Sequence, residues 1–587
     1  MEKDFHNNMN QKSHISSIRQ QIVRALGTFS VPERAAFIIA ILLCVIALCR
    51  IVYTINEHFL VVIPAEGGTL NEGIIGTPRY INPLLAVTDA DHDITRLVYR
   101  GLMKEDANGN LVPDLADSFT VSPDNLTYTF TLKKAYFQDG QQITSDDVLF
   151  TIQSAVNPTL GSSERVSWEG VDVKAIDSKT IAFTLKQPYA PFLENMTLGI
   201  LPKHVWQNIS YDNWSYSTNN TTSVIGSGWY KITKVSQTAS GIPEYYNLSL
   251  YKKDDDNAPL IDTIVTKFYS SEDTLISAYN SGDIDTMGGI DPKDAVTLSK
   301  QGAIIMTTPL PRIFGLFFNP SQQKIFTDAK VRLAISVAIN KDAIVNDVLY
   351  GYGETINSPI PRSIQLTDDS KPAPNTGNIN LAKSILEKDG WRIGADGIYT
   401  KVISKKETDR LSFEIDTNNT PELKQSIDHI VSDLQAAGIE AIPKVYETGS
   451  LNQDIIRPRK FESLFFGQVV SNQADLFAFW DSSQRASPGL NISGYANQNV
   501  DKLLEQGTNT LDQTSQINIY KKFEKEINAD IPAVFVYSPS YIYVVRPEIA
   551  NGIKLTHIIH PEDRFFDETN WYIEIDHVWK IFAKSAN

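Results

Sequence analysis

The sequence predicts a mixed α/β protein that follows one N-terminal transmembrane helix. Three patterns lead to this prediction: one long apolar segment, strands with alternating apolar side chains, and helices with an apolar stripe. A chain of 587 residues exceeds what a single hydrophobic core usually supports. At roughly 100–200 residues per domain we expect about three packed lobes, enough to enclose a deep cleft.

Composition and charge exclude several classes of protein. Charged residues make up 21% of the chain and apolar residues 42%, as in ordinary globular proteins. The formal charge of −16 and the lack of Lys and Arg runs argue against nucleic-acid binding. The only cysteines, Cys44 and Cys49, both lie in the apolar segment. The rest of the chain therefore has no thiol for catalysis, no disulfide framework and no cysteine-ligated zinc.

The apolar segment has the length of a membrane span. It runs from Ala35 to Cys49 without a polar residue and continues past Arg50 to Tyr53. About 19 residues match a bilayer core of about 30 Å, and Arg50 can reach the headgroups. More basic than acidic residues precede the segment: Lys3, Lys12, Arg19, Arg24 and Arg34 against Glu2, Asp4 and Glu33. The positive-inside rule predicts a cytoplasmic tail at residues 1–34, an anchor at 35–55, and the remaining chain outside.

Two other interpretations of this segment are a cleaved signal peptide and a lipoprotein signal. The first small residue that could serve as a cleavage site, Ala65, lies far beyond the segment. Bulky Leu43 and Leu48 precede the two cysteines, which is a poor lipoprotein signal. We therefore favour an uncleaved anchor, followed by a linker from Val61 to Gly68.

Strands and helices alternate after the linker. Tyr128, Phe130 and Leu132 alternate with threonines, which predicts a half-buried strand over 126–132. Thr144 and Asp147 have the spacing of a capping box before an apolar run, and this spacing predicts a helix start. Ile181, Phe183 and Leu185 predict another strand. Apolar residues at helical spacing predict an amphipathic helix from about Asp328: Val331, Ala334, Ile335, Ala338 and Ile339.

A search for catalytic and metal-binding motifs finds none that is complete. Asp89, Asp91 and Asp93 have the opening spacing of a calcium loop, but the glycine and bidentate glutamate that such a loop needs are missing. His557 and His560 lack a third ligand at a recognisable spacing, so a surface or packing role is favoured. The phosphate-loop, zinc-protease and serine-hydrolase motifs are absent from the sequence. We expect no enzyme, no cofactor and no metal.

Short segments in one fixed order carry a family resemblance. They include Gly67-Gly68-Thr69-Leu70, Ile81-Asn82-Pro83-Leu84, Tyr99-Arg100-Gly101-Leu102, Phe137-Gln138-Asp139-Gly140, Leu201-Pro202-Lys203-His204, Phe326-Thr327-Asp328 and Gly390-Trp391. The set spans roughly residues 67–545 and resembles the bacterial extracellular solute-binding proteins that include the oligopeptide- and dipeptide-binding proteins of ABC importers.

The resemblance implies a three-lobed fold like that of periplasmic binding proteins. Lobe I would contain residues 66–112, 223–312 and 540–587, lobe II 113–222, and lobe III 313–539. Two hinge strands, near 311–318 and 535–543, would let lobe III close on lobe I around a ligand.

The resemblance also implies function and partners. The protein would capture a peptide-like ligand and deliver it to ABC permease subunits, as a monomer in the cell membrane. A non-peptide ligand, such as an oligosaccharide, a metal chelate or a lipid-like molecule, is a second possibility. A membrane-tethered sensor or scaffold that uses the tail is a third, and a peptidase is a distant fourth.

In the peptide-binding relatives an aspartate pairs with the free amino terminus of the ligand. The corresponding stretch begins at Gly467, and the aspartate falls on Asn472, with Ser471 as the neighbouring possibility. An amide offers a neutral acceptor, which leaves recognition of a free amine open. Asp475 could replace the aspartate, or it could simply start a helix.

Other predicted ligand-binding residues lie in two more regions. Thr77 and Arg79 precede one of the family segments, and Arg79 could pair with a ligand carboxylate or remain a solvated loop residue. Trp480, Phe535 and Tyr537 could line the cleft or belong to the core.

Overall fold

The computed structural model describes residues 29–106, 109–251, 258–364, 366, 376–555 and 557–581. The chain separates into two units, one containing residues up to Ala65 together with those from Glu574, and the other containing Glu66–Ile573. Residues 1–28 of the predicted cytoplasmic tail lie outside the described residues.

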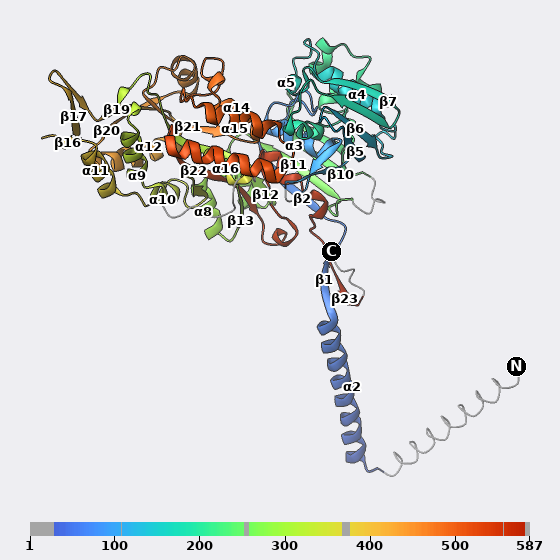
Figure 1. Ribbon diagram of the computed structural model, residues 1–587. Helices are drawn as coiled ribbons and strands as arrows, with labels where there is room; N and C mark the ends of the chain where they lie inside the picture. The colour runs from blue at the N-terminus through green and yellow to red at the C-terminus, as the bar shows by residue number, and fades with distance from the viewer. Residues whose placement is uncertain are drawn as a thin grey trace. The chain divides into compact units, whose positions relative to one another are not determined.

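The first unit contains the predicted membrane helix. Helix α2 (Val31–Phe59) has 29 residues, none of them buried, and starts with a capping box between Ser30 and Glu33 (Figure 1). In the described part of the chain it is the one helix long and apolar enough to span a membrane. The predicted apolar N-terminal helix is thus confirmed, and it extends four residues past the predicted end at residue 55, while its insertion in a membrane stays a prediction.

The unit also contains a strand pair that the sequence analysis missed. Strand β1 (Leu60–Pro64) pairs antiparallel with β23 (Ile575–Trp579), where we expected a linker on one side and part of lobe I on the other. The indole Nε1 of Trp579 donates to Asn56 Oδ1 at 2.7 Å, and its ring stacks on Phe59. The β-branched run Val61–Ile63 favours a strand, but its partner lies at the other end of the sequence, out of reach of local patterns.

This pairing predicts a specific crosslink. Backbone hydrogen bonds join Ala65 to Glu574 and Lys580 to Phe59, so Val62 and His577 form a non-hydrogen-bonded pair between them. Cα atoms in such pairs lie about 4.5 Å apart, within disulfide range. Val62→Cys with His577→Cys should therefore form a disulfide on mild oxidation of the purified full chain, detected as a mobility shift. Each single variant is the control, and a double variant that stays reduced would contradict the pairing.

The second unit is built on a 12-stranded mixed sheet. Its main path is β20-β19-β21-β14-β22-β12-β2-β11-β10-β9, and β13 and β15 also pair with β22. The strands are β2 (Thr69–Ile75), β9 (Tyr230–Gln237), β10 (Pro243–Leu250), β11 (Thr263–Tyr269), β12 (Thr286–Gly288), β13 (Ile304–Pro309), β14 (Arg312–Phe318), β15 (Gly353–Thr355), β19 (Ser412–Asn418), β20 (Glu440–Tyr446), β21 (Ser463–Val469) and β22 (Ala533–Val545).

Smaller sheets lie at the two ends of this unit. A four-stranded sheet contains β5 (Ala116–Val121), β6 (Thr127–Leu132), β7 (Asp172–Asp177) and β8 (Thr180–Thr184). Figure 1 shows it with α4 (Ser145–Ala155) at one end of the unit, and β16 (Arg392–Ile393) and β17 (Tyr399–Ser404) at the other. Strand β17 also pairs with β18 (Glu407–Arg410), and β3 (Met103–Glu105) pairs with β4 (Leu111–Pro113).

Helices surround the strands. The longer ones are α3 (Asp89–Val98), α7 (Glu272–Ser281), α8 (Pro292–Lys300), α9 (Ala329–Ala338), α10 (Lys341–Asp347), α11 (Ile379–Lys388), α12 (Pro421–Ala436), α14 (Gln473–Trp480), α15 (Gln498–Asn509) and α16 (Gln513–Asp530). The predicted local elements are confirmed: Tyr128, Phe130 and Leu132 are buried in β6, the Thr144 box starts α4, and Asp328 caps α9.

Strand β22 joins the hydrophobic cores of the second unit. All but two of its 13 residues are buried. Phe535 and Val536 belong to two cores beside β14, whereas Tyr543 and Val544 belong to two other cores beside β12 and β13. The two predicted hinge segments are therefore neighbouring strands, β14 and β22. Their role as a hinge and the three lobe boundaries stay predictions.

Candidate functional site

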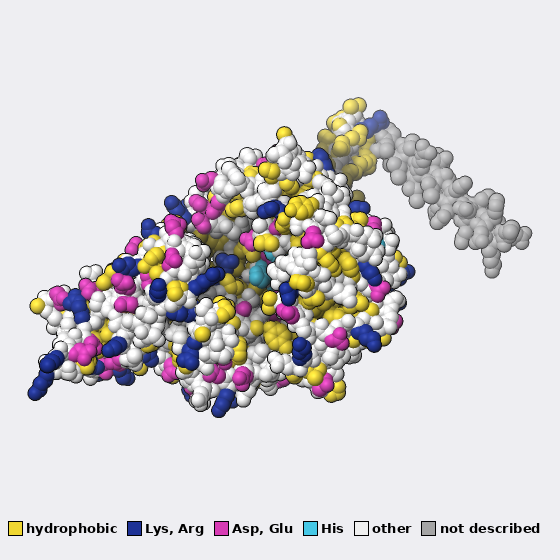
Figure 2. Space-filling view, turned by 90° about the horizontal axis from the view of Figure 1, so that it is seen from above, with side chains coloured by type: hydrophobic (Ala, Val, Ile, Leu, Met, Phe, Trp, Pro, Cys, Tyr) yellow, Lys and Arg dark blue, Asp and Glu magenta, His cyan; other side chains and the backbone are white. Residues whose placement is uncertain are grey.

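A cavity of about 570 Å³ lies in the second unit, a volume in the range of small-ligand sites. Six stretches of the sequence line it: residues 83–99, with Asp89, His92 and Arg96 of α3; Glu105 of β3; Ser163 and Glu164; the end of the 3-10 helix η1 (Ala190–Thr197) with the residues up to 199; Ser471 and Asn472; and residues 559–566. On the face seen in Figure 2 the unit is hollowed, and histidine side chains are visible in the hollow.

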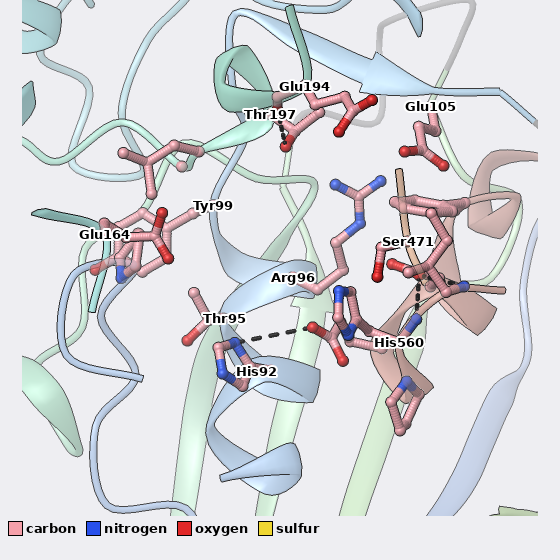
Figure 3. Close-up of a pocket in the computed structure, with 18 of the residues that line it drawn as sticks. His92, Thr95, Arg96, Tyr99, Glu105, Glu164, Glu194, Thr197, Ser471 and His560 are labelled. Atoms are coloured by element: carbon pink, nitrogen blue, oxygen red, sulfur yellow. Dashed lines mark hydrogen bonds and ion pairs between the residues drawn. The ribbon is translucent and has the colours of Figure 1, made fainter. Parts of the chain in front are cut away.

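Helix α3 presents two functional side chains to the cavity. The Thr88 hydroxyl accepts from Asp91 N at 3.2 Å, which fixes the helix start. The Asp91 carboxylate in turn accepts from the backbone N–H groups of Arg79 and Tyr80. His92 and Arg96, one turn apart, consequently share one face, and Figure 3 shows Arg96 pointing toward the space between Glu194 and Glu105.

A buried ion cluster holds α3 against the 3-10 helix η9 (Pro561–Phe565). Arg564 is 4% exposed and binds both oxygens of Asp93, at 2.5 and 2.7 Å, and Glu72 Oε1 at 2.9 Å. The hydroxyl of Tyr543, on β22, donates to the other oxygen of Glu72 at 2.7 Å. The cluster thereby ties β2, α3, β22 and η9 together beneath the cavity.

Removing the guanidinium should destabilise the protein strongly. Arg564→Met leaves two buried carboxylates without a cation, which costs about 3–5 kcal/mol. Urea denaturation of the purified full chain, followed by tryptophan fluorescence, measures the effect. Arg564→Lys, which keeps the charge but loses the paired geometry, should give an intermediate result.

Arg410→Met is the matched control, because Arg410 forms its ion pairs with Asp396 and Glu440 at the exposed surface. This control should leave the denaturation midpoint nearly unchanged. Equal effects of the two Arg→Met substitutions would show that the buried cluster has no special importance.

Asn472 connects two sides of the cavity. Its Oδ1 accepts from Ala474 N at 2.9 Å and so caps α14, while its Nδ2 donates to Glu194 Oε2 at 2.9 Å. An aspartate at 472 could cap the helix equally well, but it would place a second carboxylate against Glu194. Burial raises the pKa of Glu194 to about 7, and the Asn472 hydrogen bond opposes this shift.

Three other carboxylates of the cavity have partners. Glu562 lies 3.8 Å from His92, and Glu105 lies 3.4 Å from His557. Asp563 accepts from the N–H groups of residues 559 and 560, at 2.9 and 2.6 Å, and burial raises its pKa to about 7. Burial also raises the pKa of Glu164. The cavity is thus lined by acidic groups that have lost much of their hydration.

Comparison with known proteins identifies the family of this chain. The family model of bacterial extracellular solute-binding proteins, family 5 (middle region), matches residues 110–487. The chain belongs to this family. Members bind solutes outside the cytoplasm, and the 570 Å³ cavity is this family member's candidate solute site.

Relatives cover nearly the whole of the chain. The oligopeptide-binding protein AppA of Bacillus subtilis is 27% identical over 520 residues, which are 87% of this chain and 92% of the relative. Its structure in complex with a nonapeptide has a TM-score of 0.62 at 26% identity, covering 87% of this chain and 100% of that one. NikZ of Campylobacter jejuni, in complex with Ni(L-His), has a TM-score of 0.64 at 25% identity, covering 86% and 99%.

Two of the predicted ligand-binding residues, Ser471 and Asn472, line the cavity of this solute-binding protein. Asp475 accepts from Ser471 N at 2.7 Å within the capping box of α14. Asp475 and the other predicted residues are not among the cavity-lining residues: Thr77, Arg79, Gly467, Trp480, Phe535 and Tyr537. Their ligand-binding roles stay predictions.

Each of these others has a structural environment of its own. The Arg79 side chain is exposed above the Tyr80 ring. Trp480 is 1% exposed and packs edge to face on Phe535, and the Tyr537 hydroxyl donates to Glu422 at 2.8 Å. Gly467 pairs with Phe314, whose ring leaves no room for a Cβ there.

Sequence reasoning missed most of the cavity. His560 lines it, although a surface or packing role was favoured, and Glu164, Glu194 and Glu562 were not singled out. Single acidic residues in loops carry no motif, so no local signal could have found them. Only the family position of Asn472 pointed to this place.

One group of described residues could surround a cation elsewhere: Glu272, Asp291 and Asp294. Glu272 accepts from Asp291 N at 2.8 Å, beside the start of α8. Exposed acidic groups at a helix start are common without a metal, so we assign no ligand to them.

Proposed function

We propose that the protein captures a peptide-like solute in this cavity and delivers it to the permease of an ABC importer. The carrying observation is that Ser471 and Asn472, which the resemblance relates to the amine-binding segment, meet α3 and η1 around a 570 Å³ cavity. The names of the relatives support a peptide: AppA is an oligopeptide-binding protein, and its solved complex contains a nonapeptide.

In this proposal α2 holds the protein in the cell membrane. The helix is apolar from Ala35 to Cys49, and basic residues precede this run, so the N-terminus is cytoplasmic and the solute-binding unit is outside. Each monomer binds its own ligand without a cofactor and performs no reaction on it.

Capture would proceed by closure of two parts around the ligand. Away from the two hinge strands, side-chain contacts among the described residues that connect our lobe III with the other lobes include Asn472 with Glu194, and Ser363 O with His557 Nε2 at 2.6 Å. A ligand that contacts both sides stabilises the closed arrangement by its differential affinity for it. This supports hinge closure as the mode of binding.

Peptide binding is tested with the purified full chain in nanodiscs. Calorimetry and tryptophan fluorescence against peptides of increasing length should detect dissociation constants on the order of micromolar or tighter. Mass spectrometry before and after incubation should find the peptides intact. Absence of binding across lengths and charges would overturn the proposal, and cleavage would favour a peptidase.

Filling the cavity should abolish capture. Ser471→Trp adds an indole at the lining and should weaken peptide affinity at least about tenfold by steric exclusion, with little change in thermal stability because Ser471 is not buried. Ser240→Trp, in an exposed turn, is the control. Unchanged binding by the Ser471 variant would place the ligand elsewhere.

Membrane topology can be tested with single cysteines. After replacement of Cys44 and Cys49, Ser240→Cys should react with an impermeant maleimide in intact cells, whereas Ser13→Cys should react only after lysis. Extraction with alkaline carbonate should leave the chain in the membrane. Labelling of both cysteines in intact cells, or release of the chain, would contradict the anchored arrangement.

A metal chelate is the alternative that a specific relative favours, because NikZ is solved with Ni(L-His) and two histidines line this cavity. Native mass spectrometry of the co-purified ligand, with metal analysis, distinguishes the two. Deletion of residues before Arg34 tests the sensor alternative, since uptake should survive if the tail only sets topology.

A further inference from the structure

More acidic than basic side chains line the cavity. Six carboxylates line it, against one guanidinium and two histidines: Asp89, Glu105, Glu164, Glu194, Glu562 and Asp563 against Arg96, His92 and His560. A low-dielectric wall strengthens charge interactions, so this imbalance acts on any charged solute that enters. The lining therefore disfavours an anionic group and attracts a cationic one.

Four of the six carboxylates have no cationic partner in the described part of the chain: Asp89, Glu164, Glu194 and Asp563. Asp89 is exposed and Asp563 accepts two backbone hydrogen bonds, which leaves Glu164 and Glu194. In the described part of the chain, no Lys, Arg or His nitrogen lies within ion-pair distance of Glu164 or Glu194. Glu164 has no hydrogen bond to its carboxylate among the contacts found there, and Glu194 has the single amide bond from Asn472. A buried carboxylate in such surroundings is costly to ionise and gains most from an incoming cation.

Arg96 does not fill this role. Its guanidinium stacks over the Phe566 ring at 4.2 Å, and Figure 3 shows it reaching toward Glu194 and Glu105 without an ion pair to either. The acidic charge at Glu194 thus stays available to a ligand.

This inference rests on the proposed function. We propose that the solute has a cationic group that binds Glu194, and that the protein prefers basic peptides over acidic ones. Asn472 positions this carboxylate: its amide holds one oxygen at 2.9 Å and leaves the other free for the ligand. The source of the cation is either the α-ammonium or a basic side chain. Glu164, across the cavity in Figure 3, offers a second carboxylate for a longer basic ligand.

The same geometry couples cation binding to pH. Burial, together with Glu105 and Asp475, raises the pKa of Glu194 to about 7, so the group is mostly protonated at pH 6 and mostly ionised at pH 8. Binding through the ionised form should therefore strengthen about tenfold between these pH values, with proton release. The other groups around Glu194 are Arg96, Glu164, Tyr189, His92, His560, Glu562 and Asp563.

One of these neighbours acts in the same direction. Asp563, whose pKa is also about 7, loses negative charge at acid pH.

The test compares peptides that differ only in charge. Ala-Lys-Ala-Ala, Ala-Gln-Ala-Ala and Ala-Glu-Ala-Ala, each with a free and an acetylated amino terminus, are titrated calorimetrically into the full chain at pH 6 and pH 8. The Lys peptide should bind best and about tenfold more tightly at pH 8, whereas the acetylated Gln peptide should show no such gain. The acetylated Lys and free Gln peptides distinguish a side-chain cation from the α-ammonium.

Glu194→Gln keeps an acceptor for Asn472 but removes the charge. It should reduce affinity for the preferred cationic peptide about 10- to 100-fold, as expected for a charge-assisted hydrogen bond, and reduce its pH dependence to the part that Asp563 contributes. Glu169→Gln, an exposed carboxylate paired with Arg165, is the control.

Equal binding of acidic and basic peptides, or an unaffected Glu194→Gln variant, would overturn the charge inference while the capture function stands. Failure of every peptide to bind would overturn both.

Discussion

The second unit depends on one strand. Strand β22 pairs with β14 and β15 at one end and with β12 and β13 at the other, and its side chains enter all four hydrophobic cores. Tyr543 of this strand also binds Glu72, the carboxylate that shares Arg564 with Asp93. A single buried strand therefore connects the packing of the sheet to the ion cluster beneath the cavity. Displacing it would disturb both at once.

The cavity is built from loops and helix ends that this frame fixes. Helix α3 is held by the cluster, η9 contributes Arg564 itself, and Asn472, just beyond β21, caps the start of α14. Polar side chains at such positions have two roles, because they cap helix ends and also line the cavity. Asn472 combines the two, because its oxygen caps while its nitrogen binds Glu194.

The local elements and the fold class could be predicted from the sequence because they depend on periodicity and capping signals between residues that are close in the sequence. Strand β6, the start of α4 and the stripe of α9 are examples, and the apolar run of α2 is another. The β1–β23 pair could not be predicted, because its strands are more than five hundred residues apart. Most of the cavity-lining residues could not be predicted for a similar reason: Glu194 and His560 line the same cavity only because of the tertiary fold.

The position of Asn472 was the exception, and the structure changes its meaning. Taken alone, an amide where relatives are expected to have an aspartate removes the negative charge that a cation needs. In the folded protein Glu194 lies beside Asn472, so Glu194 supplies the carboxylate that can bind a cation. An amide at position 472 avoids the like-charge repulsion that an aspartate would cause there. A substitution that weakens one interpretation of the sequence thus supports the same chemistry in the folded protein.

Uncompensated carboxylates also have a thermodynamic consequence for selectivity. Raising the pKa of Glu194 from 4.5 to about 7 corresponds to a cost on the order of 3 kcal/mol for ionising it in the empty cavity. A cationic ligand offsets this cost on binding, a neutral ligand leaves the group protonated, and an anionic ligand adds repulsion to it. The free energy of binding therefore differs among the three ligand classes. The protein can select ligands by charge even where it holds the rest of a peptide through the peptide backbone.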